Sequence, residues 1–80
     1  MSDTIALIST GEELLTGETI DTNSAWLAAE VWDRGFYVSR MLTCGDALED
    51  LVWAFEEATQ ASDKVICTGE LQQGGGGGGP

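Results

Sequence analysis

The sequence predicts an α/β fold with a mainly parallel sheet, built from a β-α-β-α-β run of elements. Residues 4–10 form a continuous apolar run, which is typical of a strand buried on both faces. Two later stretches with helical spacing of apolar residues alternate with two further strand-like stretches. Such alternation implies right-handed crossovers, so the helices are expected to pack on the faces of a parallel sheet.

The first crossover is predicted to contain a loop and then a helix. Residues 11–17 are bracketed by glycines and are predicted as a loop or short turn. Residues 21–24 are all cap-forming, so they predict a helix that continues to about residue 34. Gly35 stands where a glycine after a helix adopts positive φ. The apolar stripe of this helix is expected to contain Trp26, Leu27, Ala28, Val31 and Trp32.

The second strand and helix follow. Residues 36–43 are predicted as a strand, and the polar Ser39 and Arg40 within it favour an edge position. Asp46 is expected to cap the next helix, because Asp46 and Glu49 have the spacing of a capping box. The side chains expected to bury one face of that helix are Leu48, Leu51, Val52, Phe55 and Ala58.

The third strand is predicted over residues 63–68 and ends at Gly69. Cys67 lies late in this strand and is expected in the core. Cys44 lies beside the carboxyl end of the second strand, yet nothing basic is near it in sequence to lower its pKa.

Negative charge is the strongest bias of the composition. The chain carries 14 acidic and 3 basic side chains, a formal net charge of −11. This charge repels nucleic-acid phosphates and anionic membrane surfaces, so neither is expected as a partner. A phosphorylated small molecule would need backbone N–H groups or a divalent cation to offset the negative field locally.

The cysteines and the N-terminus favour a cytoplasmic protein. The 2 cysteines have no close pairing, and the absence of histidine removes a typical zinc site. There is no secretory signal, and no apolar run approaches the roughly 20 residues that span a bilayer. We expect residues 1–71 to fold and residues 72–80, rich in glutamine and glycine, to be a disordered tail.

A ligand site is expected beyond the carboxyl ends of the strands, where ligands collect in parallel α/β sheets. The loops at residues 10–17, 44–46 and 68–70 each place glycine beside a hydroxyl or a carboxylate. Their backbone N–H groups can bind phosphate, and Glu12, Glu13 and Asp46 can hold a divalent cation such as Mg²⁺. Plain turn and cap roles explain the same residues, so both interpretations stand at this point. A Walker A motif and a dinucleotide fingerprint are both absent, and a Ser-His-Asp triad needs a histidine.

Four short motifs follow one another in a particular order and spacing. They are residues 9–17 (STGEELLTG), residues 21–24 (DTNS), Gly45-Asp46 and Thr68-Gly69. In this order and spacing they resemble the N-terminal domain of the CinA (competence/damage-inducible) family, which is related to the MoaB/MogA group of molybdopterin-binding proteins. The resemblance covers residues 4–69.

The resemblance implies a three-layer α/β domain, of which residues 1–71 would form the N-terminal half. It implies a pocket for a molybdopterin-like ligand, either a phosphorylated pterin or a nucleotide. In CinA-type proteins this domain is associated with metal-dependent hydrolysis of the ADP-ribose pyrophosphate bond. Asp46 matches an aspartate of the pterin site and is the expected catalytic residue. The expected ligand-binding residues are Thr10, Gly11, Glu12, Glu13, Asp21, Thr22, Asn23, Gly45, Thr68 and Gly69.

The chain departs from the family pattern after Gly69. Glu70 replaces a second glycine, Gln72 and Gln73 replace a glycine and a proline, and a polyglycine tail follows. Glu70 puts a negative charge where the backbone should approach phosphate. This abrupt change is typical of truncation, of a frameshift or of an appended tail, and we expect little turnover from the chain alone. The alternative is a non-catalytic binding or assembly module, or an inactive fragment, that another chain or a second copy in a homo-oligomer completes.

Overall fold

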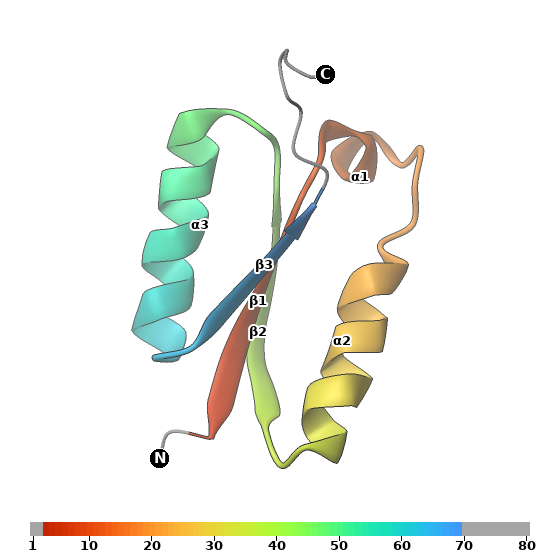
Figure 1. Cartoon of the computed structure of the whole chain (residues 1–80). Coiled ribbons are helices and arrows are strands. Elements are labelled where there is room, and N and C mark those ends of the chain that lie inside the picture. Colours follow the sequence, from red (N-terminus) through yellow and green to blue (C-terminus); the bar gives the residue numbers. More distant parts are fainter. Residues whose placement is uncertain (1–2, 70–80) are drawn as a thin grey trace, which may run out of the picture.

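The computed structural model describes residues 3–69 and confirms the β-α-β-α-β run, with one additional short helix (Figure 1). In chain order the elements are β1 (Thr4–Thr10), α1 (Glu12–Thr16), α2 (Thr22–Asp33), β2 (Tyr37–Cys44), α3 (Leu48–Ala61) and β3 (Val65–Gly69). Glu70 and the expected disordered tail at residues 72–80 lie outside the described residues.

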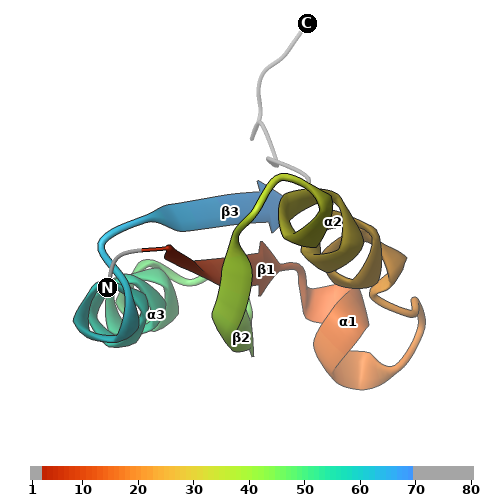
Figure 2. The same cartoon turned by 90° about the horizontal axis from the view of Figure 1, so that it is seen from below.

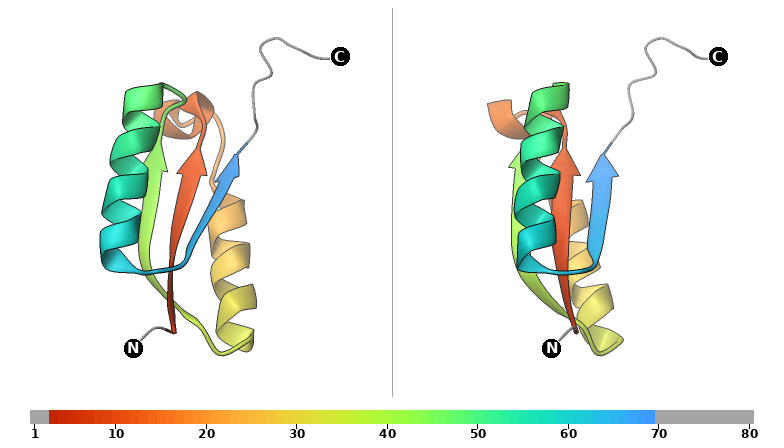
Figure 3. Two further views of the ribbon diagram at one scale, coloured as in Figure 1. Left: turned by 60° about the vertical axis from the view of Figure 1, so that its left-hand side comes forward. Right: turned by 90° about the vertical axis from the view of Figure 1, so that its left-hand side faces the viewer.

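The three strands form one parallel sheet in the order β2-β1-β3. β2 therefore lies at an edge of this sheet, as its polar residues predicted, and β1 lies in the centre. α2 packs on one face and α3 on the other, which gives the three layers that the resemblance implied (Figures 2 and 3). β2 lies on one edge of β1, and the chain then returns past β1 to place β3 on its other edge. The direction of strand addition therefore reverses, and the gap between β1 and β3 is a topological switch point.

β1 is buried on both faces, as its unbroken apolar run predicted. Successive side chains of a strand point to opposite faces, and each face of β1 has its own apolar cluster. Leu7 and Ile8 are the largest fully buried side chains among the described residues, at 1% and 0% exposure. Complete burial of such a side chain contributes about 1.5–3 kcal/mol. The cluster under α2 contains Ile5, Leu7 and Val31, and the cluster under α3 contains Ala6, Ile8, Cys44, Ala54 and Ala58.

Hydroxyl groups close the amino-terminal end of the sheet. The register between β1 and β2 shifts between Ile5 and Ala6, whose partners are Val38 and Arg40, so Ser39 is the extra residue of a bulge. The Oγ atoms of Ser39 and the buried Ser62 are 2.6 Å apart, and Ser62 Oγ donates to Thr4 Oγ1 at 2.9 Å. These bonds satisfy a buried polar side chain next to the apolar cluster.

Two local predictions are wrong. Residues 11–17 were predicted as a loop or short turn, but residues 12–16 form the short helix α1, which Gly17 caps at its C-terminus with a left-handed φ of 86°. α3 begins at Leu48 after Ala47, and no side chain caps it, so Asp46 is not its cap. The backbone N–H of Asp46 instead donates to Glu12 Oε2 at 3.1 Å, which holds residue 46 in the loop before the helix.

The predicted apolar stripes are confirmed only in part. Leu27 and Val31 of α2 and Leu51 and Ala58 of α3 face the core, as predicted. Trp26 and Trp32 are 61% and 66% exposed, and Trp32 makes an edge-on ring contact with Tyr37 at 6.4 Å between centroids. On α3 the fully buried side chains are Ala54 and Ala58. The alanines face the sheet, whereas the large residues Leu48, Val52 and Phe55 are exposed on the flank of the helix.

Cys67 is exposed, although the sequence placed it in the core. It lies on β3, and Figure 3 shows α3 in front of β2 and β1 with β3 beside it. Cys67 pairs with Ile8 and so faces the α3 side, where it is exposed, whereas Val65 on the same side of β3 packs against the cluster under α3.

Replacing Leu7 by alanine is expected to destabilise the fold strongly. Leu→Ala changes at buried sites cost about 2–5 kcal/mol, whereas domains of this size have only about 0.05–0.15 kcal/mol of stability per residue. Urea unfolding followed by far-UV circular dichroism measures the effect. Leu15→Ala is the control. Because Leu15 is 55% exposed, this substitution should shift the urea midpoint of unfolding little. Equal shifts in the two variants would contradict the central role of β1.

Candidate functional site

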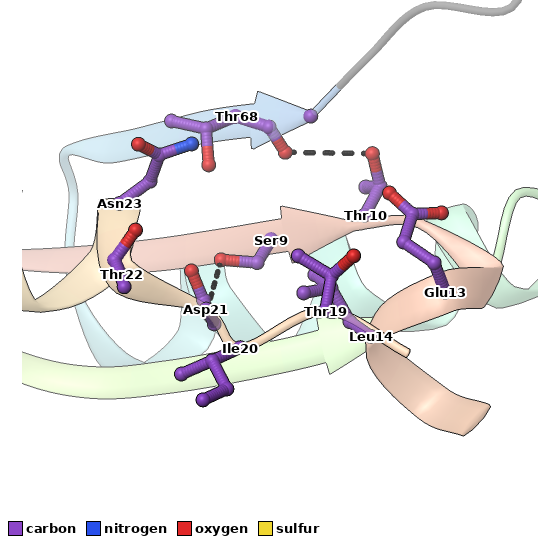
Figure 4. Close-up of a pocket in the computed structure, with 11 residues that line it drawn as sticks. Ser9, Thr10, Glu13, Leu14, Thr19, Ile20, Asp21, Thr22, Asn23 and Thr68 are labelled. Atoms are coloured by element: carbon purple, nitrogen blue, oxygen red, sulfur yellow. Dashed lines mark hydrogen bonds between the residues drawn. The ribbon is translucent and has the colours of Figure 1, made fainter. Parts of the chain in front are cut away.

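A pocket of about 380 Å³ opens at the carboxyl ends of β1 and β3, beside the N-terminus of α2 (Figure 4). This is the switch point of the sheet, where ligands bind in open α/β folds. The pocket is lined by Ser9, Thr10, Glu13, Leu14, Thr19, Ile20, Asp21, Thr22, Asn23, Thr68 and Gly69.

The parallel register of β1 and β3 brings two of the sequence motifs together. Ser9 pairs with Thr68 and Thr10 pairs with Gly69, so residues 58 or more positions apart share one edge. Thr10 Oγ1 donates to the Thr68 carbonyl at 3.4 Å. Gly69 has a φ of 150°, and a Cβ atom there would lie 2.7 Å from the Thr10 carbonyl oxygen. Glycine is therefore required at the position where the end of β3 approaches β1.

Asp21 fixes the start of α2 against the end of β1. Its Oδ1 accepts the backbone N–H of Ser24 at 3.1 Å, which makes it the N-cap of α2, as the cap-forming cluster predicted. Its Oδ2 accepts the hydroxyls of Ser9 and Ser24, each at 2.8 Å. Ser9 and Ser24 are both buried, and their Oγ atoms are 2.7 Å apart.

These hydrogen bonds keep Asp21 ionised. Partial burial raises the pKa of Asp21, but the hydrogen bonds from Ser9 and Ser24 and from two backbone amides outweigh it, and the net pKa lies below the ordinary 3.8. The pocket thus has a fixed negative charge at the N-terminus of α2, where it also offsets the positive end of the helix dipole.

The remaining polar groups of the pocket are hydroxyls, one amide and one further carboxylate. Thr10, Thr19, Thr22 and Thr68 supply the hydroxyls, Asn23 the amide and Glu13 the carboxylate. Among the described residues that line the pocket there is no lysine or arginine. Leu14 and Ile20 add apolar surface. This chemistry suits a ligand with N–H and O–H donors and a flat apolar part.

A second contact joins the start of α1 to the loop after β2, outside the pocket. Besides the bond from the Asp46 amide to Glu12, the N–H of Gly11 donates to the Cys44 carbonyl at 3.1 Å. A Cβ atom on the buried Gly45 would collide with the Glu12 carboxylate. The glycine and acidic residues of this contact are thus used to hold two loops together.

The structure therefore divides the residues that the sequence singled out. The residues that line the pocket are Thr10, Glu13, Asp21, Thr22, Asn23, Thr68 and Gly69, and those that do not are Gly11, Glu12, Gly45 and Asp46. Four lining residues were not among the predicted ligand-binding residues: Ser9, Leu14, Thr19 and Ile20. A signal existed for Ser9, because it is a hydroxyl residue at the end of the buried apolar run.

The carboxylates expected to hold a cation are separated. Glu13 lines the pocket, whereas Glu12 and Asp46 lie at the second contact. Within residues 3–69 no group of three or more His, Cys, Asp or Glu side chains is placed to hold a metal ion.

Cys44 is not suited to nucleophilic chemistry. It is buried, and burial raises the pKa of its thiol, as do the negative charges of Asp50, Asp46 and Glu12. The sequence likewise places no basic residue near Cys44 that would lower the pKa of this thiol.

The family described as "Probable molybdopterin binding domain" matches residues 6–71. The chain belongs to this family. The resemblance to CinA proteins is confirmed as well. A CinA-like protein of Shewanella amazonensis is 43% identical over 67 residues, which are 84% of this chain and 16% of that protein. A protein of Shewanella oneidensis named nicotinamide-nucleotide amidohydrolase PncC is 40% identical over 67 residues, which are again 84% of this chain and 16% of that protein. The chain thus spans about 16% of the length of the curated relatives that it matches.

A solved structure shares the fold. The crystal structure of CinA from Thermoplasma acidophilum, described as a protein of unknown function, superposes with a TM-score of 0.85 at 32% identity. The match covers 90% of this chain and 43% of that one. Separately, no helix within residues 3–69 combines the length and hydrophobicity required of a membrane span.

Replacing Asp21 by asparagine is expected to lower stability in a pH-dependent way. Because the folded pKa lies below 3.8, the charge of Asp21 stabilises the fold above that pH, and this stabilisation is lost as the pH falls through the folded pKa. Asparagine is an equally good helix cap, but its Nδ2 group cannot accept from the Ser9 and Ser24 hydroxyls, so the variant removes the charge together with these two hydrogen bonds. The part of the stability difference that changes with pH reports the charge.

The difference in unfolding free energy between the two proteins should therefore be largest near neutral pH and shrink below pH 3.8. Urea titrations at several pH values measure it. Glu18→Gln, at an exposed site, controls for the loss of one negative charge. A difference that grows towards low pH would show that Asp21 does not carry a stabilising charge.

Proposed function

We propose that the switch-point pocket binds a phosphorylated pterin or nucleotide, and that in longer relatives the site takes part in hydrolysis of the ADP-ribose pyrophosphate bond. The observation that carries the proposal is the pocket itself, which gathers polar residues from the β1 end, the α2 start and the β3 end. Membership of a family described as molybdopterin-binding supports the pterin class. The name of the Shewanella oneidensis relative, which refers to a nicotinamide nucleotide, supports the nucleotide class.

The two ends of the pocket suit different parts of such a ligand. Asp21 accepts hydrogen bonds at the α2 end, so it suits the amino and N–H groups of a heterocycle or the hydroxyls of a ribose. Its carboxylate repels phosphate, which is better placed near Thr10 and Thr68, whose hydroxyls can donate. Glu13 lies beside Thr10 at this end of the pocket, so its negative charge there must be offset by a cation (Figure 4). We infer that the ring or sugar lies towards α2 and the phosphate towards the ends of β1 and β3.

A resident metal site does not fit the described residues, which contain no cluster of three ligating side chains. Mg²⁺ is commonly held by one or two carboxylates together with substrate phosphates. We propose that a divalent cation enters with the phosphates, and Glu13 is the pocket carboxylate suited to meet it, since Asp21 already accepts three hydrogen bonds.

The composition supports a cytoplasmic protein that does not bind nucleic acid or membranes. The net charge of −11 opposes contact with polyanions. Both cysteines are free thiols, which suits a reducing compartment.

Thr68→Val should weaken binding of ADP-ribose. The variant removes one hydroxyl from the pocket without changing side-chain volume, and the loss of one hydrogen bond costs about 1 kcal/mol, roughly fivefold in Kd. Thr43→Val is a matched control, because Thr43 and Thr68 both pair with Ser9 but only Thr68 lines the pocket. Isothermal titration calorimetry with Mg²⁺ present measures both. Equal affinities in the two variants, or no binding by the unaltered chain, would overturn the proposed site.

The chain alone should bind ADP-ribose without hydrolysing it. Asp46, the residue that the resemblance implies in catalysis, lies outside the pocket lining. Release of AMP, followed by chromatography with and without Mg²⁺, is expected to stay at the background rate. Turnover that Asp46→Ala abolishes would contradict this expectation and would place Asp46 in the reaction.

A further inference from the structure

Asn23 places an uncommitted carboxamide at the α2 end of the pocket. It lies in the first turn of α2, lines the pocket and is exposed. Figure 4 shows its side chain extending from α2 into the space between α2 and the end of β3. Within residues 3–69 no protein group forms a hydrogen bond with this carboxamide. Its donor and its acceptor are therefore both available to a ligand.

The neighbouring carboxylate of Asp21 is committed to the fold. It accepts hydrogen bonds from the hydroxyls of Ser9 and Ser24 and from the backbone amides of Ser24 and Asn23. A carboxylate has about four acceptor positions, so these bonds use most of its capacity. Turning the Asp21 side chain towards a ligand would also release the cap of α2. Asp21 thus contributes a fixed charge at this end, and Asn23 contributes the adaptable hydrogen-bonding group.

This division of roles favours one kind of ring edge. A carboxamide matches an edge on which a donor lies next to an acceptor, because it presents one of each in the same plane. The amino group and neighbouring ring nitrogen of adenine form such an edge, which asparagine binds through two hydrogen bonds in protein–DNA complexes. Two adjacent donors, as on the 2-amino edge of a pterin or a guanine, instead match a free carboxylate. Glu13 is such a carboxylate, but it lies at the other end of the pocket beside Thr10 (Figure 4).

We propose that Asn23 determines the base specificity of the pocket by binding the edge of an adenine ring that carries the amino group. This inference rests on the proposed binding of a nucleotide and narrows its base to adenine. The ring then lies against the start of α2, and the phosphates extend towards Thr10 and Thr68, away from the charge of Asp21.

ADP-ribose and its 1,N6-etheno derivative are a matched pair of probes for this contact. They share the riboses and the phosphates, but the etheno bridge removes both hydrogens of the adenine amino group. Asn23→Leu keeps the approximate size of the side chain and removes its donor and its acceptor. Isothermal titration calorimetry of the full chain with Mg²⁺ should show that this variant raises the Kd of ADP-ribose by about fivefold or more. The Kd of the etheno derivative should stay unchanged, because that probe lacks the donor that Asn23 recognises.

Gln60→Leu is the matched control. It makes the same chemical change at an exposed site on α3 outside the pocket lining, so it should alter neither Kd. Far-UV circular dichroism checks that both variants are folded, and leucine favours the helix more than asparagine does.

The outcomes separate this inference from the proposed function on which it rests. If Asn23→Leu leaves the Kd of ADP-ribose unchanged, Asn23 does not contact the base. If it weakens both probes equally, Asn23 acts on the sugar, the phosphates or the shape of the pocket. Either result overturns the inference, while binding of ADP-ribose by the unaltered chain still supports the proposed function. If the unaltered chain binds neither probe, both are overturned.

Discussion

The structure depends on the burial of β1 between two helical layers. Leu7 points to the α2 side and Ile8 to the α3 side, and both are excluded from solvent. Because β1 is also paired on both edges, its carboxyl end is fixed relative to β2 and β3 alike. The pocket begins where the apolar run of β1 gives way to Ser9 and Thr10, so the position of the site follows directly from the position of the core.

Asp21 connects the fold to the chemistry of the site. Three hydrogen bonds offset the cost of placing its charge beside the buried Ser9 and Ser24, and the same bonds tie α2 to β1. The carboxylate that caps α2 therefore also forms a negatively charged wall of the pocket. In the proposed binding mode the phosphate lies away from that wall, at the ends of β1 and β3, where Gly69 lets the backbone come close.

The elements and half of the site were predictable because their signals are local. The apolar run of β1 and the cap at Asp21 each identify a structure within a few residues, and the rule that ligands lie at strand ends brings Thr10 and Thr68 together. The position of Asp46 was not predictable, because it depends on strand order. The loop after β2 lies across β1 from β3, and no local pattern encodes the order β2-β1-β3. The exposure of Cys67 has the same origin, since it depends on which strands α3 covers.

The order of the strands also explains what β3 contributes to the site. Among the described strands β3 pairs with β1 alone, and its carboxyl end meets β1 through the pairs Ser9–Thr68 and Thr10–Gly69. The pocket therefore depends on this pairing, because Thr68 and Gly69 line it from the β3 side and Ser9 and Thr10 line it from the β1 side.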